Sequence, residues 1–434
     1  MMISFLEKKF KIDLKYFLSG GSWLFLGQIA ATLRAIIISV FLARFFEINE
    51  FGKFAYIMAV FSMANIFGAP GMSIAIFQSV SRGFEGTLRY LMKKIFYIGL
   101  LGSLFFIFCQ LYFNFVQQEN NHYIFLALAL IFPFYSVGTN FAYHVSGLKK
   151  FKDRIYFEIL MNLFILFSVF TSYIIKEDIY YLIIAITLSQ TIISLAYLFY
   201  LIKRSNDKID YDSYKYGKKL NWNYVIPTIK MQLDRIFISN FLGYEKTATY
   251  NVAYSFSNQI TTAAKVLGAL IVPKSSNLTK KEIRERLNLK NIILSLLVLF
   301  SFSTIIIFFI PFIIRILYGN NYMEAIRFAQ VMLFFIPLRS FSLILRNINE
   351  SQKNIKIINI TSNHMSIIEI VLMLCGLLFF EIWGLIFAKI ISDLISIIWQ
   401  LAGISGLLNI YGADSEMMCC LLCSEKPTLN KERY

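Results

Sequence analysis

The chain has 434 residues, of which 57% are apolar and 44 are phenylalanine, and this composition excludes an ordinary soluble domain. Its formal net charge of +16 lies in short segments between apolar runs, without the interleaved aromatics of a nucleic-acid surface, which excludes nucleic acid as a partner. The five cysteines do not form a disulfide framework, and the cluster Cys419, Cys420 and Cys423 has no histidine in the tail to complete a metal site. We therefore expect no metal.

Apolar runs of membrane-spanning length fill the chain, since a bilayer core takes roughly 20 helical residues to cross. Twelve spans are expected, at residues 17–45, 54–80, 91–116, 122–145, 155–175, 179–202, 221–242, 248–272, 291–317, 325–347, 357–380 and 384–409. The sequence thus predicts an all-α polytopic membrane protein with about 12 transmembrane helices.

Basic residues concentrate in alternate loops, which sets the expected orientation. The lysine- and arginine-rich segments are 1–16, 81–90, 146–154, 203–220, 273–290 and 348–356. The intervening loops carry only Lys53, Lys176 and Lys246. We expect both termini in the cytoplasm and a multi-pass protein of the bacterial inner membrane.

The polar interruption at 203–220 divides the spans into two sets of six. We expect an N-terminal lobe at 1–205, a cytoplasmic linker at 206–220, a C-terminal lobe at 221–410 and a cytoplasmic tail at 411–434. Six is an even number, so both sets begin on the same side of the membrane, as in a parallel repeat.

Polar residues recur inside several expected spans, where charge is costly and usually faces a bundle interior or a water-filled cavity. Steps of three or four residues place Tyr250, Tyr254, Ser257, Thr261 and Lys265 on one face of the span at 248–272. Other spans carry Arg34, Asn140, Lys230, Asp234, Arg235, Arg339, Glu369, Lys389 and Asp393.

Two pairs of these charges are spaced to neutralise each other within a helix. Lys230 with Asp234, and Lys389 with Asp393, stand four residues apart, and such pairs serve structure and function alike. Arg34 and Lys265 have no opposite charge at this spacing. Their partners must lie on another helix or on a ligand, and we favour a ligand.

The deep cations outnumber the deep acids. The cations are Arg34, Lys230, Arg235, Lys265, Arg339 and Lys389, and the acids are Asp234, Glu369 and Asp393. An anionic substrate such as a phosphate or pyrophosphate headgroup would balance the excess. The three acids are also candidates for coupling transport to a proton or sodium gradient.

Three segments carry a family resemblance. They are 41–56 (FLARFFEINEFGKFAY), 231–254 (MQLDRIFISNFLG followed by ATYNVAY) and 317–325 (LYGNNYMEA). In this order and spacing they resemble bacterial polysaccharide flippases of the Wzx type, within the multidrug/oligosaccharidyl-lipid/polysaccharide exporter (MOP) superfamily. Ala248 departs from the glycine usual in the family.

The resemblance implies two six-helix lobes around a central cationic cavity that opens alternately to each side. It implies transfer of an undecaprenyl-pyrophosphate-linked oligosaccharide, for O-antigen or a similar surface polysaccharide, from the cytoplasmic to the periplasmic leaflet. Arg34 and Lys265 match the family's cations in helices 1 and 8, and Asp234 matches its helix 7 acid. A polymerase and a chain-length regulator would be pathway partners.

The remaining roles follow as hypotheses. Arg235, Arg339, Lys230 and Lys389 would complete the pyrophosphate site, and sugar hydroxyls would meet Tyr250, Tyr254, Ser257, Thr261 and Asn140. The segment Gly68–Gly71 and Pro227 are candidate hinges, because proline interrupts helical hydrogen bonding.

Two other functions stay open. A drug or cation antiporter of the same superfamily would need cavity acids in excess, whereas cations are in excess here. A polytopic glycosyltransferase or O-antigen polymerase could use Asp210-Tyr-Asp212 as a metal-binding motif, but this motif lies in a short basic linker and every expected external loop is short. We therefore expect no enzyme and no cofactor.

Overall fold

The structure, a computed structural model, describes residues 14–116, 123–276, 282–283, 289–352 and 354–405, and every regular element in these ranges is helical. The elements are α2 (Leu14–Phe45), α3 (Ile48–Met63), η1 (Ala64–Gly68), α4 (Pro70–Ser81), α5 (Thr87–Val116), α6 (Ile124–Gly138), α7 (Phe141–Gly147), α8 (Phe151–Ile175), α9 (Ile179–Arg204), α10 (Asp212–Leu242), α11 (Tyr244–Ser276), α13 (Leu289–Tyr318), η2 (Asn320–Tyr322), α14 (Met323–Ser351), α15 (Ile355–Asn359), η3 (Ile360–His364) and α16 (Met365–Ser405).

The helices account for the twelve expected spans. Among the described residues, nine helical segments are long and apolar enough to cross a membrane, and the last of them, Ile357–Ile404, holds two spans. The helices α10 and α11 are also long enough, with 31 and 33 residues, but their polar residues lower the hydropathy. The predicted all-helical membrane fold is confirmed.

One span is interrupted where the sequence contains glycine and proline, at Gly68–Gly71. Ala69 has a left-handed backbone (φ 55°) and separates η1 from α4, which Pro70 begins. Proline fits this first helical position because its missing N–H would have no partner there. The segment Gly68–Gly71 therefore contains a true helix break, whereas Pro227 lies inside the continuous helix α10. That helix starts at Asp212, so the segment expected as a linker is partly helical.

A second kind of break divides α16 into two antiparallel arms. Phe380 and Glu381 leave the helical region, and Glu381 has a positive φ of 50°. A Cβ on Gly376 would lie 2.4 Å from the carbonyl oxygen of Gly384, so the arms approach backbone to backbone beside the turn. Small residues permit such close packing of membrane helices.

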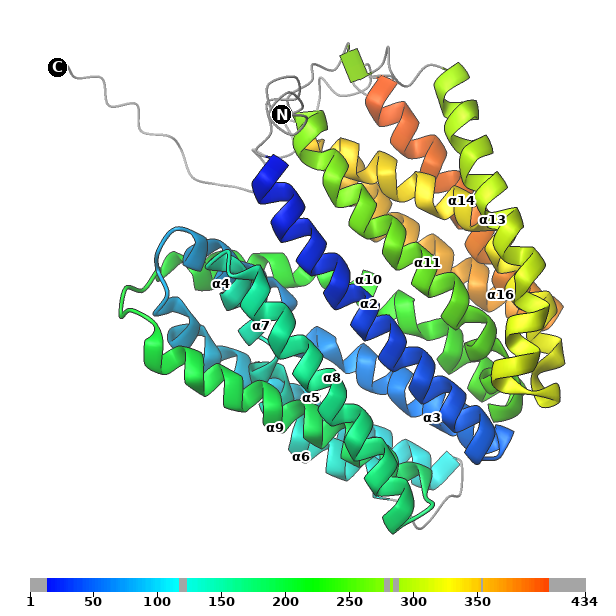
Figure 1. Cartoon of the computed structure of the whole chain (residues 1–434), viewed down its shortest axis with the longest axis horizontal. Helices are drawn as coiled ribbons and strands as arrows, with labels where there is room; N and C mark the ends of the chain where they lie inside the picture. Colours follow the sequence, from blue (N-terminus) through cyan, green and yellow to red (C-terminus); the bar gives the residue numbers. More distant parts are fainter. Residues whose placement is uncertain (1–13, 117–122, 277–281, 284–288, 353, 406–434) are drawn as a thin grey trace.

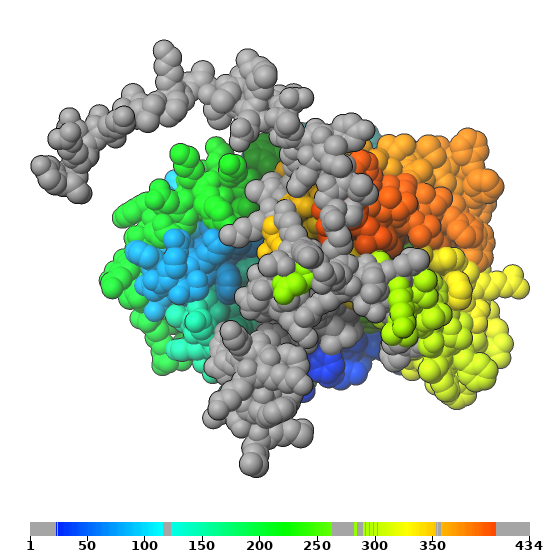
Figure 2. Space-filling view, turned by 90° about the horizontal axis from the view of Figure 1, so that it is seen from above, coloured from blue at the N-terminus to red at the C-terminus, as the bar shows by residue number. Residues whose placement is uncertain are grey.

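The helices form two groups that lie side by side, with α2 running between them (Figure 1). In one group α5 packs on α6, and α6 and α8 pack on α9; in the other, α14 packs on α11, α13 and α16. Seen from above, the light-blue to green residues lie on the left and the yellow to orange-red residues on the right (Figure 2). The helix α10 joins the groups, because it packs on α3 and α4 as well as on α16.

The groups are locked together at the end of the molecule that the loop charges predict to be periplasmic. A Cβ on Gly52 of α3 would lie 1.9 Å from the carbonyl oxygen of Tyr244, at the start of α11. The Arg44 guanidinium donates to the carbonyl of Leu317 at 2.9 Å, which satisfies a free carbonyl at the end of α13. Nearer the middle, Thr32 of α2 donates to Gln259 of α11 at 2.8 Å.

We expect the substitution Gly52→Ala to weaken the contact between α3 and α11, because the alanine methyl group would meet the backbone of Tyr244 rather than a movable side chain. Overpacking of this kind costs about 1–3 kcal/mol. Thermal unfolding of the purified protein in detergent measures the effect. Gly68→Ala is the matched control, since its Cβ would meet no atom closer than 3.9 Å. Equal melting temperatures for the two variants would contradict the contact.

Candidate functional site

The most buried charge in the described structure is the carboxylate of Asp234, on α10. Its Oδ2 lies 2.5 Å from Lys389 Nζ, on the second arm of α16, and accepts a hydrogen bond of 2.9 Å from the Tyr250 hydroxyl of α11. Its Oδ1 lies 3.7 Å from Arg235 Nε. Three helices thus place partners around one carboxylate, as a buried charge requires.

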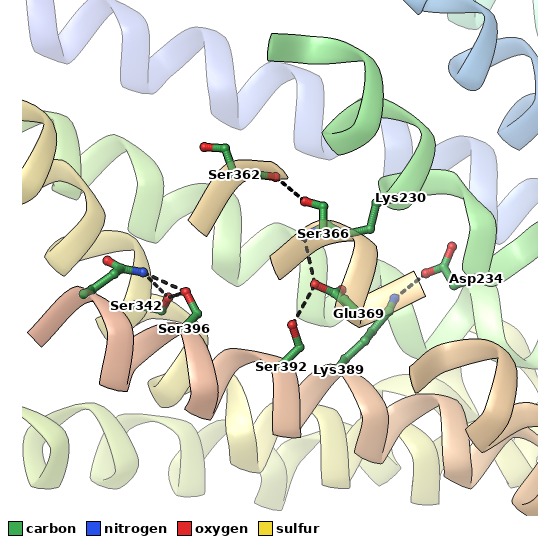
Figure 3. A network of polar contacts seen from close by, with 10 residues as sticks. Lys230, Asp234, Ser342, Ser362, Ser366, Glu369, Lys389, Ser392 and Ser396 are labelled. Carbon is green, nitrogen blue, oxygen red and sulfur yellow. Dashed lines mark hydrogen bonds and ion pairs between the residues drawn. The ribbon is translucent and has the colours of Figure 1, made fainter. Parts of the chain in front are cut away.

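A second ion pair lies beside the first. Lys230 Nζ, on α10, is 2.8 Å from Glu369 Oε2 on the first arm of α16. The same oxygen accepts a hydrogen bond of 3.1 Å from Ser392 on the second arm. Figure 3 shows Glu369 between Lys230 and Ser392, with Lys389 pointing toward Asp234.

The expected pairing within helices is wrong. Lys230 pairs with Glu369 rather than with Asp234, and Lys389 pairs with Asp234 rather than with Asp393. The reason is that α10 packs on α16, so the charges meet across the interface and are shielded there from lipid. Four residues of helix provide proximity, but not the additional hydrogen bonds that stabilise a buried carboxylate.

Two tyrosines extend the cluster. The rings of Tyr250 and Tyr254 stack with their centroids 5.9 Å apart. Lys389 Nζ lies 5.0 Å and Arg235 Cζ 5.1 Å from the ring centroid of Tyr254. The ring face attracts both cations, which is worth about 2 kcal/mol or more where water is excluded. The tyrosines therefore help to stabilise one lysine charge, on Lys389, and one arginine charge, on Arg235, in an apolar region.

A small cavity of about 40 Å³ adjoins the cluster. Its polar walls are Tyr250, Tyr254, Ser257, Arg339, Lys389 and Asp393. In the described part of the chain, Arg339 and Asp393 make no hydrogen bond and no ion pair within 4 Å. These two opposite charges face the same cavity and attract each other beyond ion-pair distance, so a ligand in the cavity would meet both.

Arg34 lies in a different pocket, within the N-terminal group of helices. This pocket has a volume of about 500 Å³ and is lined from α2, α8 and α9 by Gln28, Arg34, Asn162, Gln190 and others. The Arg34 side chain has no ion pair with any described residue, although Arg154 and Glu158 pair at 2.7 Å in the same pocket. Three of the deep cations thus line pockets, Arg34 in one and Arg339 and Lys389 in the other.

Other predicted site residues differ in their surroundings. Asn140 is fully buried, and its Nδ2 donates to the carbonyls of Ser136 and Val137. Thr261 is buried and donates to the carbonyl of Ser257 at 2.9 Å. Lys265 belongs to α11, but its side chain is outside the described part, as is the whole tail at 411–434.

Sequence reasoning missed several polar partners. Ser392 was available as a signal, because it stands three residues after Lys389 on the same stripe. Gln28, Asn162 and Gln190 give the Arg34 pocket hydrogen-bonding amides, and Gln28 and Asn162 are flanked by apolar residues. Single uncharged polar residues of this kind do not reveal from sequence which of them share a pocket.

Comparison with known proteins assigns the chain to a protein family. Residues 17–279 match the family described as polysaccharide biosynthesis protein. The chain belongs to this family. The membrane protein MJ1068 of Methanocaldococcus jannaschii is 23% identical over 393 residues, which are 81% of this chain and 78% of that protein.

Solved structures of the MOP superfamily share the fold. The lipid II flippase MurJ in an inward closed conformation is 17% identical in sequence and has a TM-score of 0.67. The match covers 95% of this chain and 94% of the MurJ chain. A MOP superfamily transporter from Pyrococcus furiosus, described as having a binding pocket of reverse polarity, is 13% identical, with 91% and 96% coverage and a TM-score of 0.59. A mutant form of the Vibrio cholerae MATE transporter VcmN is 11% identical, with 91% and 97% coverage and a TM-score of 0.60.

The substitution Asp234→Asn tests the cluster. It would leave Lys389 and Arg235 without their carboxylate in a buried region, which costs about 3–5 kcal/mol. Thermal unfolding in detergent should show a large loss of stability, and the double variant Asp234→Asn/Lys389→Met should recover part of it. The control Glu350→Gln breaks a half-exposed pair with Arg346 and should change stability by less than about 1 kcal/mol. Equal effects of the two single variants would refute the structural role of Asp234.

Proposed function

We propose that this protein is a flippase that moves an undecaprenyl-pyrophosphate-linked oligosaccharide from the cytoplasmic to the periplasmic leaflet of the bacterial inner membrane. The observation that supports it is a pair of deep guanidinium groups, Arg34 and Arg339, which face pockets and have no ion pair among the described residues. The product would be O-antigen or a similar surface polysaccharide.

The chemistry of a pyrophosphate fits these groups. A guanidinium presents several N–H donors in a plane and binds phosphate oxygens in pairs, more strongly than neutral donors do. An unpaired cation inside a membrane is unfavourable, so an anionic headgroup entering the pocket of Arg34 would gain an attraction that no described ion pair uses. The polyprenyl chain needs no pocket, because it remains in the lipid.

The charges divide into two classes under this proposal. Lys230, Lys389 and Arg235 are held by Glu369 and Asp234 and maintain the shape of the C-terminal group. Arg34, Arg339 and Lys265 would contact the headgroup. Tyr254 and Ser257, on the cavity wall, would meet sugar hydroxyls together with the amides around Arg34.

Coupling to a proton or sodium gradient would fall to Asp393. Asp234 and Glu369 already have lysine partners within 2.8 Å. Asp393 lines the cavity with Arg339 and has no ion pair within 4 Å in the described part. Its protonation or ion binding would therefore change the charge that the headgroup meets. We propose that both termini face the cytoplasm and that a polymerase and a chain-length regulator act on the delivered product.

A drug or cation antiporter is the competing function. Its cationic substrate would bind next to Asp393, whose neighbours Arg339 and Lys389 repel it. A phosphate-bearing substrate meets attraction at the same positions, so the polarity of the cavity favours the flippase.

The substitutions Arg34→Gln and Arg339→Gln should each reduce transport at least about tenfold, the effect of losing one charge-assisted contact to phosphate. The measurement uses a host that lacks the gene and expresses each variant. A membrane-impermeant glycan-modifying probe then reports the leaflet on which single lipid-linked repeat units accumulate. Unmodified units trapped on the cytoplasmic leaflet are expected.

Arg346→Gln is the matched control, because this arginine is half-exposed and pairs with Glu350 rather than facing a pocket. It should transport normally. Each variant must reach the membrane in normal amounts, as measured by immunoblotting. Normal transport by both Arg34→Gln and Arg339→Gln would refute the headgroup site, and export of organic cations without any change in glycan would support the antiporter.

A further inference from the structure

A separate polar pocket lies at the ends of α7 and α9 and the start of α8. Its volume is about 410 Å³. The charged and polar residues on its walls are Glu85, His144, Lys150, Asp153, Arg204 and Ser205. None of them belongs to the two pockets assigned above to the transported headgroup, so this pocket requires its own explanation.

His144 is the buried group at the base of this pocket, with 1% of its surface exposed. The Ser205 hydroxyl donates its hydrogen to the carbonyl of Leu201 at 2.8 Å and lies 3.2 Å from His144 Nε2. In the tautomer that is compatible with this serine bond, the ring donates through Nε2 and the neutral imidazole presents Nδ1 as an acceptor. Nδ1 is buried and has no hydrogen-bond partner among the described residues. Such an acceptor is costly unless a ligand supplies a donor.

Charges of both signs surround this acceptor. Lys150 and Arg204 are basic, and Glu85 and Asp153 are acidic. The side chains of Lys150 and Asp153 form no ion pair with any described residue, although they face one pocket. The guanidinium carbon of Arg204 lies 4.3 Å from the centroid of the Tyr200 ring, which holds it at the wall. A ligand with one negative and one positive group would match both pairs.

The position of the pocket indicates a lipid. It lies at the ends of spanning helices, where the lipid headgroups begin, and Tyr156 and Tyr200 on its walls are 55% and 44% exposed. Exposed large apolar side chains continue along α8 on the face of Tyr156, at Leu160 and Leu163. These exposed residues would contact acyl chains below a headgroup that is seated in the pocket.

We propose that this pocket binds a phospholipid with a phosphoethanolamine headgroup. The phosphate would pair with Lys150 and Arg204, and the ammonium group with Glu85 and Asp153. One ammonium N–H would reach His144 Nδ1 and satisfy it. A choline headgroup has the same charges but no N–H to donate, and a glycerol headgroup has no positive charge for the two acids.

Native mass spectrometry of the full-length protein tests this proposal. The protein is released from nanodiscs that contain equal amounts of phosphatidylethanolamine, phosphatidylcholine and phosphatidylglycerol with identical acyl chains. We expect retained phosphatidylethanolamine to exceed each of the other two by at least about fivefold, because only it supplies charge-assisted bonds to both pairs. Equal retention of the three lipids would overturn the proposal.

Variants locate the binding site. Arg204→Gln, Asp153→Asn and His144→Gln should each abolish the preference, whereas Lys203→Gln, an exposed neighbour that does not line the pocket, should keep it. The first two change exposed side chains and should leave the fold intact, which thermal unfolding checks. If all three pocket variants still retained phosphatidylethanolamine selectively, the lipid would not bind in this pocket and the proposal would be overturned. Displacement of the lipid by free phosphoethanolamine at equal concentration would overturn the assignment to a membrane lipid.

Discussion

A charge inside a bilayer must be neutralised by the protein or by a ligand, and the C-terminal half of this molecule is arranged around that requirement. Asp234 forms ion pairs with Lys389 and Arg235 and accepts a hydrogen bond from Tyr250. Glu369 forms an ion pair with Lys230 and accepts a hydrogen bond from Ser392. These contacts join α10, α11 and both arms of α16. The polar groups that look costly from sequence are therefore the groups that fix the relative positions of these helices.

The same requirement distinguishes structural from ligand-facing charges. A lysine with a carboxylate at 2.5 Å or 2.8 Å has its counter-charge, and a ligand would have to compete for it. Arg34 and Arg339 have no such neighbour in the part of the chain that is described, and each faces a pocket. Their location in different groups of helices means that a single substrate touching both would span the boundary along which α2 runs (Figure 1).

The sequence was sufficient to predict the fold because hydropathy reports membrane spans directly. Spans expected at 17–45 and 179–202 correspond to α2 (Leu14–Phe45) and α9 (Ile179–Arg204). Even the least apolar spans, at 221–242 and 248–272, were expected from their apolar runs, and they correspond to α10 and α11. Lys230, Asp234, Glu369 and Lys389 were also recognised as deep charges, and they do meet in one cluster.

The partners of these charges could not be derived in the same way. Spacing along one helix favours Lys230 with Asp234, but the observed partner, Glu369, is 139 residues away and meets it only because α10 packs on α16. The surroundings of Asn140 were equally hidden, since a stripe position shows which face of a helix a residue occupies but not what covers that face. Packing between helices decides both, and the positions of the spans along the sequence do not specify that packing.

The turn in α16 has a consequence for how the chain is made. Only Phe380 and Glu381 separate its two arms, and Gly376 and Gly384 bring the backbones into contact beside them. Because the connection is this short, insertion of the two arms together as a helical hairpin keeps both apolar arms out of water. In such a hairpin Glu369 enters the membrane beside Ser392 of the opposite arm, and its lysine partner, Lys230, belongs to α10, which is synthesised earlier.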